Sequence, residues 1–187
     1  MSVSIKKLKK EDINLCVKLH KQSYPNYLFT SRFSDKLLAK FYSKLIDYCE
    51  YNYAICWNET YVGLIIAGKS SANARNSFIK ENLISLMVVL LKNPKFFIKK
   101  TFSIFSKSYA SIYKLRLLNI LVSPKYQSKP ITLNAIRLFE NKLENNNEEI
   151  YGLSVRSNNL KAINFYIKNG SRIETIQNGS VYFFKHV

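Results

Sequence analysis

Two strand–loop–helix patterns follow each other in the second half of the chain, between Leu118 and Gly170. The first pattern puts the loop Gln127–Thr132 directly before an amphipathic run, so this loop is expected at the start of a helix. Free backbone N–H groups and the dipole make a helix N-terminus a binding site for anions such as phosphate. The second pattern contains Asn158 and Tyr166, which would add an amide and a phenol. Together the two patterns indicate a site for a phosphorylated cofactor.

The hydrophobic pattern predicts a mixed α/β fold that would hold these two patterns side by side. Strands are predicted at residues 2–8, 53–57, 61–67, 112–122, 150–155, 173–176 and 181–184. Helices are predicted at residues 11–23, 35–49, 78–92, 94–107, 131–143 and 159–168. We therefore expect one α/β (α+β) domain over residues 1–187, with a mixed, mostly antiparallel sheet of about seven strands flanked by helices.

An insertion at residues 70–111 separates the predicted hairpin from the long strand at 112–122. It begins with a polar stretch, residues 70–77, which is predicted as a loop, and continues with two apolar helices. The second of these helices has Asn93 as a favourable N-cap and Pro94 at its first position. The insertion is expected to form extra core, a lid, a face for a homodimer or a surface for a bulky acceptor.

The composition narrows the class of protein. The 187 residues carry a formal net charge of +17 and are 47% hydrophobic, which argues against disorder. Lysines occur in nearly every segment, so the charge favours a solvated surface and a field for a polyanionic ligand over a nucleic-acid interface. Three cysteines without CxxC spacing predict neither disulfides nor a metal site, and no signal peptide or membrane span is indicated. We expect a cytoplasmic protein.

Two motifs in the second half of the chain resemble those of the GCN5-related N-acetyltransferase (GNAT) superfamily. They consist of Ile120–Gln127, followed by Leu153–Val155, Asn158, Ala162, Phe165, Tyr166 and Gly170. The resemblance implies a GNAT-like fold with acetyl-CoA as co-substrate and no metal. It also implies direct transfer of the acetyl group to a primary amine, which is the reaction of an acyl-CoA N-acyltransferase.

The same resemblance implies roles for individual residues. The backbone of Leu121 and Val122 would hold the pantetheine arm and the acetyl carbonyl, where an N–H would stabilise an oxyanion. The pyrophosphate would lie on the loop made by Gln127, Ser128, Lys129, Pro130, Ile131 and Thr132. Asn158 would bind the amide region of the cofactor, and it is also a candidate N-cap of the helix that follows. Tyr166 would be the general acid for the leaving thiolate, with Phe165 facing the core.

The sequence departs from the superfamily pattern in its loop and in its central strand. Pro130 and Thr132 stand where the pattern has Gly and Gly or Ala, and Pro130 has no backbone N–H. The segment Lys114–Asn119 lacks the Glu that many relatives carry as a general base. His20 is a candidate base, and an acceptor amine of low pKa would instead deprotonate through water. These departures keep a non-catalytic GNAT-like binding module as the alternative to an enzyme.

The acceptor is inferred from the first third of the chain and the insertion. The segments Leu19–Pro25 and Ser34–Tyr42, with the insertion, resemble the GNAT branch associated with amino-sugar acetylation for surface polysaccharides. The favoured acceptor is a nucleotide- or lipid-linked amino sugar, and the alternative is a protein N-terminus or a small amine. Basic and aromatic residues of the insertion would suit peripheral contact with the inner membrane surface: Lys92, Lys95, Lys99, Lys100, Lys107, Phe96, Phe97, Phe102 and Phe105.

Overall fold

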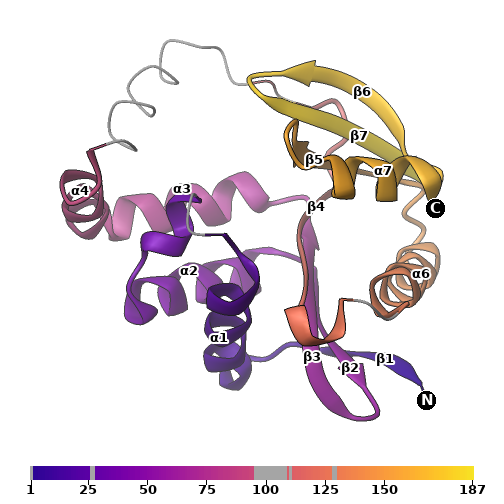
Figure 1. Ribbon diagram of the computed structural model, residues 1–187, viewed down its shortest axis with the longest axis horizontal. Helices are drawn as coiled ribbons and strands as arrows, with labels where there is room; N and C mark the ends of the chain where they lie inside the picture. The colour runs from indigo at the N-terminus through magenta and orange to yellow at the C-terminus, as the bar shows by residue number, and fades with distance from the viewer. Residues whose placement is uncertain (1, 26–27, 95–108, 110, 128–129) are drawn as a thin grey trace.

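The computed structural model describes residues 2–25, 28–94, 109, 111–127 and 130–187 (Figure 1). Within these residues, a seven-stranded sheet has the order β1-β2-β3-β4-β5-β7-β6. Its strands are β1 (Val3–Lys7), β2 (Tyr51–Trp57), β3 (Thr60–Gly68), β4 (Arg116–Val122), β5 (Ile150–Arg156), β6 (Arg172–Gln177) and β7 (Ser180–His186). Neighbouring strands are antiparallel except β4 and β5, which are parallel. The predicted mixed, mostly antiparallel sheet is confirmed, while the helix predicted at 94–107 lies, beyond Pro94, outside the described residues.

Helices cover both faces of the sheet, with α1–α4 on one side and α6 and α7 on the other (Figure 1). They are α1 (Ile13–Ser23), α2 (Asp35–Tyr48), α3 (Ser71–Glu81), α4 (Leu83–Leu91), α6 (Ile131–Glu144) and α7 (Leu160–Lys168). Leu64 and Ile66 of β3 pack with Leu38 of α2 in one core. Ile65, which points to the opposite face, packs with Phe139 of α6 in the other. Successive side chains of β3 therefore point to opposite faces of the sheet, and the core has two layers.

Short sequence signals set the turns and helix ends. The Ser34 hydroxyl accepts a hydrogen bond of 3.2 Å from the Leu37 backbone N–H, which caps the start of α2. The β2–β3 turn, Asn58–Glu59, has φ angles of 45° and 65°, and the β6–β7 turn, Asn178–Gly179, has φ angles of 50° and 69°. Positive φ at both turn positions matches the twist of the flanking strands. Both predicted hairpins are confirmed.

Two boundaries predicted around the insertion are wrong. Residues 70–77 were expected to be a loop, but nearly all of them form the first part of α3. Ala74 and Phe78 lie one turn apart and are buried in the same core as α2, so packing outweighs the polar composition. The helix expected at 78–92 is interrupted at Asn82. Its side-chain Nδ2 donates a hydrogen bond of 2.9 Å to the Phe78 carbonyl, and α4 begins after it.

The long strand expected at 112–122 begins only at Arg116. The segment before Arg116 hydrogen-bonds instead to a carboxylate in β6. Glu174 accepts hydrogen bonds of 2.7 Å from Tyr109 Oη and 2.8 Å from Ser111 Oγ. The pairing of β6 with β7 skips Glu174, so a β-bulge turns this residue out of the strand ladder. The bulge therefore anchors the point where the chain returns to the sheet.

We expect Glu174→Ala to lower the free energy of unfolding by about 3 kcal/mol. The Glu174 side chain is 6% exposed and lies 3.7 Å from Arg116 Nη1, so its removal leaves a buried guanidinium without its carboxylate. Urea denaturation followed by circular dichroism measures the change. Glu144→Ala, at an exposed position of α6, is the matched control and should change stability by less than about 0.5 kcal/mol. Equal effects of the two variants would contradict the anchoring role.

Candidate active site

The parallel strands β4 and β5 separate soon after they meet. Their pairing consists of Arg116 with Gly152 and Leu117 with Leu153, after which the strands diverge. At the joint the Arg116 side chain lies over Gly152, and a Cβ at this position would come within 2.3 Å of Arg116 Nη1. The space beyond the joint is a cleft of about 740 Å³. Crevices at the carboxyl ends of strands in α/β sheets commonly bind ligands.

The cleft brings together most of the predicted site residues. Those that line it are Leu121, Val122, Gln127, Pro130, Thr132, Asn158 and Tyr166. Ile131 is fully buried in the core under α6, so its side chain does not reach the cleft. Ser128 and Lys129 lie outside the described residues. His20 is buried elsewhere, at the end of α1.

A β-bulge bends β4 beside the cleft. The pairing of β3 with β4 passes from Ile66 and Asn119 to Ala67 and Leu117, which leaves Leu118 without a partner. Bulges interrupt the hydrogen-bond ladder and increase the local twist. Because β5 no longer pairs with β4 beyond the joint, the main-chain groups on that edge of β4 are available to a ligand. This edge is where a bound chain-like molecule would find backbone partners.

The loop before α6 forms a second wall of the cleft. Gln127 Nε2 donates a hydrogen bond of 3.1 Å to the Val122 carbonyl, which ties the loop to the end of β4. Pro130 stands at the N-cap of α6 with φ −72° and ψ 25°, and its carbonyl accepts from the Asn134 N–H at 3.1 Å. Proline lacks an N–H, but Thr132 in the first turn has a hydroxyl that lines the cleft. The α6 N-terminus therefore offers its dipole and a hydroxyl, with one backbone donor fewer.

The start of α7 differs from the expectation in one respect. Its N-cap is Asn159, whose Oδ1 accepts from the Ala162 N–H at 3.2 Å, so the capping role considered for Asn158 belongs to its neighbour. Both asparagines line the cleft. Arg156 and Lys161 line it too, and they are the charged residues among its described lining. Two basic side chains, with no carboxylate among the described lining residues, make the cleft suited to a polyanion.

Tyr166 lies on α7 with its phenol at the cleft. Its side chain is 8% exposed, and its ring packs beside Phe183, with 6.1 Å between the ring centroids. Burial, with a smaller contribution from Tyr24, raises the pKa of Tyr166 well above its usual range, so the phenol is protonated at neutral pH. Phe165 was expected in the core, yet it is only half-buried and lines the cleft as well.

Tyr24 is a cleft residue that the sequence did not reveal. Its Oη donates a hydrogen bond of 2.7 Å to Asn119 Oδ1 on β4, in the segment that lacks a glutamate. Burial raises its pKa well above the usual range, so this phenol is also protonated at neutral pH. In the sequence, Tyr24 belonged to the segment Leu19–Pro25 and was given no role of its own. Tyr24 and Tyr166 place two neutral phenols at one site, from opposite faces of the sheet.

The candidate base His20 lies behind Tyr24 and does not line the cleft. Its side chain is 1% exposed, its Nδ1 lies 2.9 Å from Tyr42 Oη, and its ring centroid lies 4.3 Å from that of Tyr24. Burial and then the nearby Lys21 lower the pKa of His20 to about 4, so the imidazole is neutral at pH 7. Its Nε2 has no hydrogen-bond partner in the described part of the chain. His20 contacts the cleft through Tyr24.

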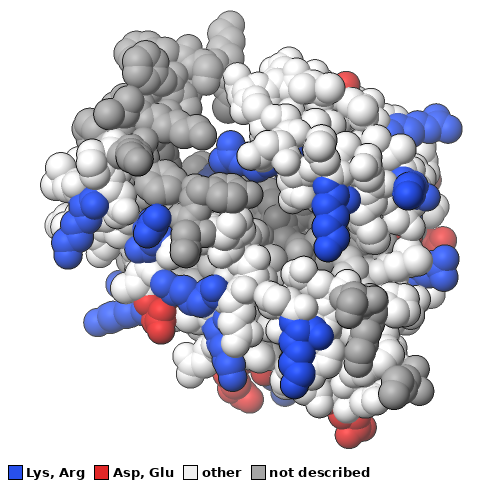
Figure 2. Space-filling model, viewed as in Figure 1, with Lys and Arg blue, Asp and Glu red and all other residues white. Residues whose placement is uncertain are grey.

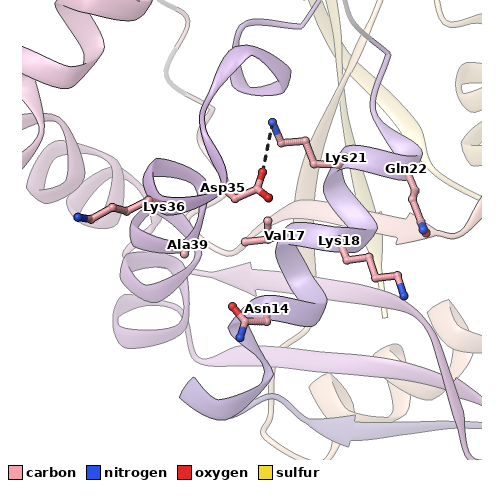
Figure 3. Close-up of a pocket in the computed structure, with 8 residues that line it drawn as sticks. All are labelled: Asn14, Val17, Lys18, Lys21, Gln22, Asp35, Lys36 and Ala39. Carbon is pink, nitrogen blue, oxygen red and sulfur yellow. Dashed lines mark ion pairs between the residues drawn. The ribbon is translucent and has the colours of Figure 1, made fainter.

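A second hollow of about 560 Å³ lies between α1 and α2 (Figure 3). Its polar side chains include Lys18, Lys21 and Lys36, and Lys21 Nζ lies 3.6 Å from Asp35 Oδ1. No residue of β4, β5 or α7 borders it among the described residues. The hollow therefore does not share the chemistry of the cleft.

The described part of the chain lacks two further kinds of feature. Among residues 2–25, 28–94, 109, 111–127 and 130–187, no cluster of His, Cys, Asp or Glu is arranged to hold a metal ion. Over the same ranges, no helix is both long and apolar enough to span a membrane.

Comparison with solved structures identifies the fold as that of the GNAT N-acetyltransferases. A PaiA N-acetyltransferase from Thermoplasma acidophilum, solved with coenzyme A, matches with a TM-score of 0.64 at 16% identity, covering 100% of both chains. The ribosomal-protein-S18-alanine N-acetyltransferase of Escherichia coli matches with a TM-score of 0.61 at 15% identity, covering 100% of this chain and 94% of that chain.

A third similar structure contains a bisubstrate analogue. It is Naa50 of Arabidopsis thaliana in complex with CoA-Ac-MVNAL, which matches with a TM-score of 0.58 at 18% identity, covering 98% of this chain and 97% of that chain. No protein-family model matches the sequence, and a search of curated proteins finds no match. The similarity thus establishes the fold: one α/β domain with the GNAT arrangement of sheet and helices.

Proposed function

We propose that the protein is an acetyl-CoA-dependent N-acetyltransferase that transfers acetyl directly to a primary amine. The observation that carries this proposal is the cleft between the diverging strands β4 and β5, with a protonated phenol, basic side chains and a helix N-terminus around it. Solved acetyltransferases of the same fold with CoA or a CoA-linked analogue bound support it.

The cleft offers separate groups for each part of acetyl-CoA. The α6 N-terminus, Thr132, Arg156 and Lys161 would bind its phosphates, which favours a retained cofactor site despite Pro130. The unpaired edge of β4 at Leu121 and Val122 would bind the pantetheine arm. Asn158 and Asn159 would bind its amides, although Asn159 Oδ1 already caps α7.

The proposed reaction needs one proton donor and one site for the acceptor amine. The amine lone pair forms the new C–N bond at the thioester carbonyl, and the C–S bond breaks. Tyr166, whose raised pKa keeps the phenol protonated in the resting enzyme, gives its proton to the thiolate as the C–S bond breaks, and the phenolate then takes a proton back from water. The amine proton leaves to water, since no carboxylate is found among the described lining residues. Tyr24, held by Asn119, would orient the amine.

The acceptor class is a finer part of the proposal. A nucleotide- or lipid-linked amino sugar remains the favoured acceptor on the sequence resemblance. A protein N-terminus is the second candidate, because two of the similar structures are a ribosomal-protein-S18-alanine N-acetyltransferase and Naa50 in complex with CoA-Ac-MVNAL. Use of acetyl-CoA would place the reaction in the cytoplasm.

A thiol-release screen tests the activity. Acetyl-CoA is offered with amino sugars, nucleotide-linked amino sugars, short peptides with free N-termini and small amines, and free CoA is measured by its thiol. Release of CoA that depends on an acceptor supports the enzymatic function and identifies the class of acceptor. Calorimetry with acetyl-CoA separates the alternatives: binding without release for any acceptor favours the non-catalytic module, and no binding at millimolar concentration removes the cofactor site.

The pH dependence should be set by the acceptor. We expect kcat/KM to rise between about pH 6 and 9 with the deprotonation of the acceptor amine. Tyr166 stays protonated over this range because its pKa is raised, and His20 stays neutral because its pKa is about 4. Profiles for two acceptors of different pKa measure this, and their midpoints should differ by the same amount. A shared midpoint near pH 6.5 would instead reveal a base on the enzyme.

A further inference from the structure

Helix α4 has an unusually apolar sequence for a helix at the surface. Its nine residues, Leu83–Leu91, carry no charge, and Ser85 is their polar member. Five of its large apolar side chains are exposed: Leu83 57%, Ile84 82%, Met87 43%, Val88 44% and Leu91 69%. Only Leu86 is buried among the residues of this helix. A patch of this kind on a water-exposed helix marks a surface that meets an apolar partner.

The exposed side chains form one stripe rather than a scatter. With 100° between successive residues, Leu83, Leu91 and Val88 project within an arc of about 140°. Ile84 and Met87 fall inside the same arc, while the buried Leu86 projects away from it, toward the core that includes Phe78. An apolar arc wider than about 100° is the width that a helix normally buries. One side of α4 thus packs on the protein, and the apolar stripe on its other side faces solvent.

The surroundings of this stripe are basic. Lys80 precedes α4, Lys92 follows it, and both are exposed. The nearby Glu81 is paired with Lys44 at 2.6 Å, so its charge is offset. At the left edge of the molecule, where α4 lies, Figure 2 shows uncharged surface with Lys or Arg side chains below it. With a net charge of +17 over the chain, an anionic partner is attracted to this edge.

We propose that α4 docks on an anionic lipid surface, with the stripe Leu83, Ile84, Met87, Val88 and Leu91 inserted at the level of the headgroups. An apolar face beside cationic side chains is the composition of helices that lie in a membrane interface. Lys80 and Lys92 would then contact lipid phosphates while the stripe enters the acyl boundary. A second copy of the chain would cover the apolar stripe equally well, but it would bring its own Lys80 and Lys92 toward like charges. The inference is independent of the proposed acetyl transfer.

Vesicle sedimentation tests the docking. The full chain is mixed with vesicles of phosphatidylcholine alone or with about one third phosphatidylglycerol. We expect binding to the anionic vesicles, weak binding to the neutral ones, and at least about tenfold weaker binding of the double variant Ile84→Glu/Val88→Glu. Ile176→Glu on β6, where the isoleucine is 63% exposed, is the matched control and should bind as the parent does. Circular dichroism confirms that each variant is folded.

Three results would overturn the proposal. They are no binding of the parent chain to anionic vesicles, equal losses in the α4 and control variants, and binding that the α4 variants leave unchanged. Light scattering adds a separate test. A dimer of the parent that becomes monomeric in the α4 variants, without any vesicle binding, would assign the stripe to a second copy instead.

Discussion

Tyr166→Phe is expected to lower kcat at least about 100-fold while changing the dissociation constant for acetyl-CoA by less than about threefold. The substitution removes the proposed proton donor but keeps the ring that packs beside Phe183. Since the phenol is neutral and at the edge of the core, its loss should not unfold α7. Steady-state thiol release gives kcat, and calorimetry gives the affinity.

The control for this variant is Tyr53→Phe, which removes a phenol from β2 outside the cleft. It should leave kcat within about twofold of the parent value. A better leaving group offers a further readout: the deficit of Tyr166→Phe should shrink with thioesters whose thiol has a lower pKa, because their thiolates need less protonation. Unchanged turnover in Tyr166→Phe would remove the acid role and leave Tyr166 as a packing residue.

The double variant Arg156→Ala/Lys161→Ala is expected to weaken acetyl-CoA binding about 100-fold. These are the charged side chains of the described cleft lining, and each would meet a phosphate there. Pro130 has no backbone N–H, so the N-terminus of α6 offers one hydrogen-bond donor fewer, and phosphate binding should depend more on the two basic side chains. Calorimetry at two salt concentrations measures the affinity, and the parent should show the steeper salt dependence.

Lys168→Ala is the matched control for this pair. Lys168 is an exposed lysine on the same helix as Lys161 and does not line the cleft, so its loss tests the general effect of reduced charge. A similar loss of affinity in the control would mean that the overall charge of +17, rather than the cleft, attracts the cofactor. A double variant that binds as the parent does would place the phosphates elsewhere.

Features that depend on neighbouring residues were predictable from the sequence. A few neighbouring residues determine the hairpin turn Asn178–Gly179, the N-cap Ser34 and the amphipathic helix α6. The order of helices and strands could therefore be predicted. The location of Val122 and Tyr166 in one cleft also followed, through the motif resemblance. The cap of α7 was misplaced by one residue, because Asn158 and Asn159 are chemically identical and only the fold selects between them.

Features that depend on distant residues were not predictable. Tyr24 enters the site through a hydrogen bond to Asn119, and these residues are 95 positions apart. The bulge at Glu174 and the late start of β4 arise from contacts with Tyr109, 65 positions away. Helix α3 contains only a few apolar side chains, and two of them, Ala74 and Phe78, are buried because α2 packs beside them. Such tertiary contacts leave no periodic pattern in the local sequence.

The sparse joint between β4 and β5 also bears on stability. Within the described residues, the strand pairing between β4 and β5 consists of two residue pairs, and it links the half of the sheet with β1–β4 to the half with β5–β7. Gly152 at this joint leaves room for the Arg116 side chain. A ligand lying along the open edges would take the place of the missing strand-to-strand hydrogen bonds. It would hydrogen-bond to both halves of the sheet and so hold them together. The free energy of unfolding would then increase with ligand concentration. Binding of the substrate and stabilisation of the sheet would thus depend on the same hydrogen bonds.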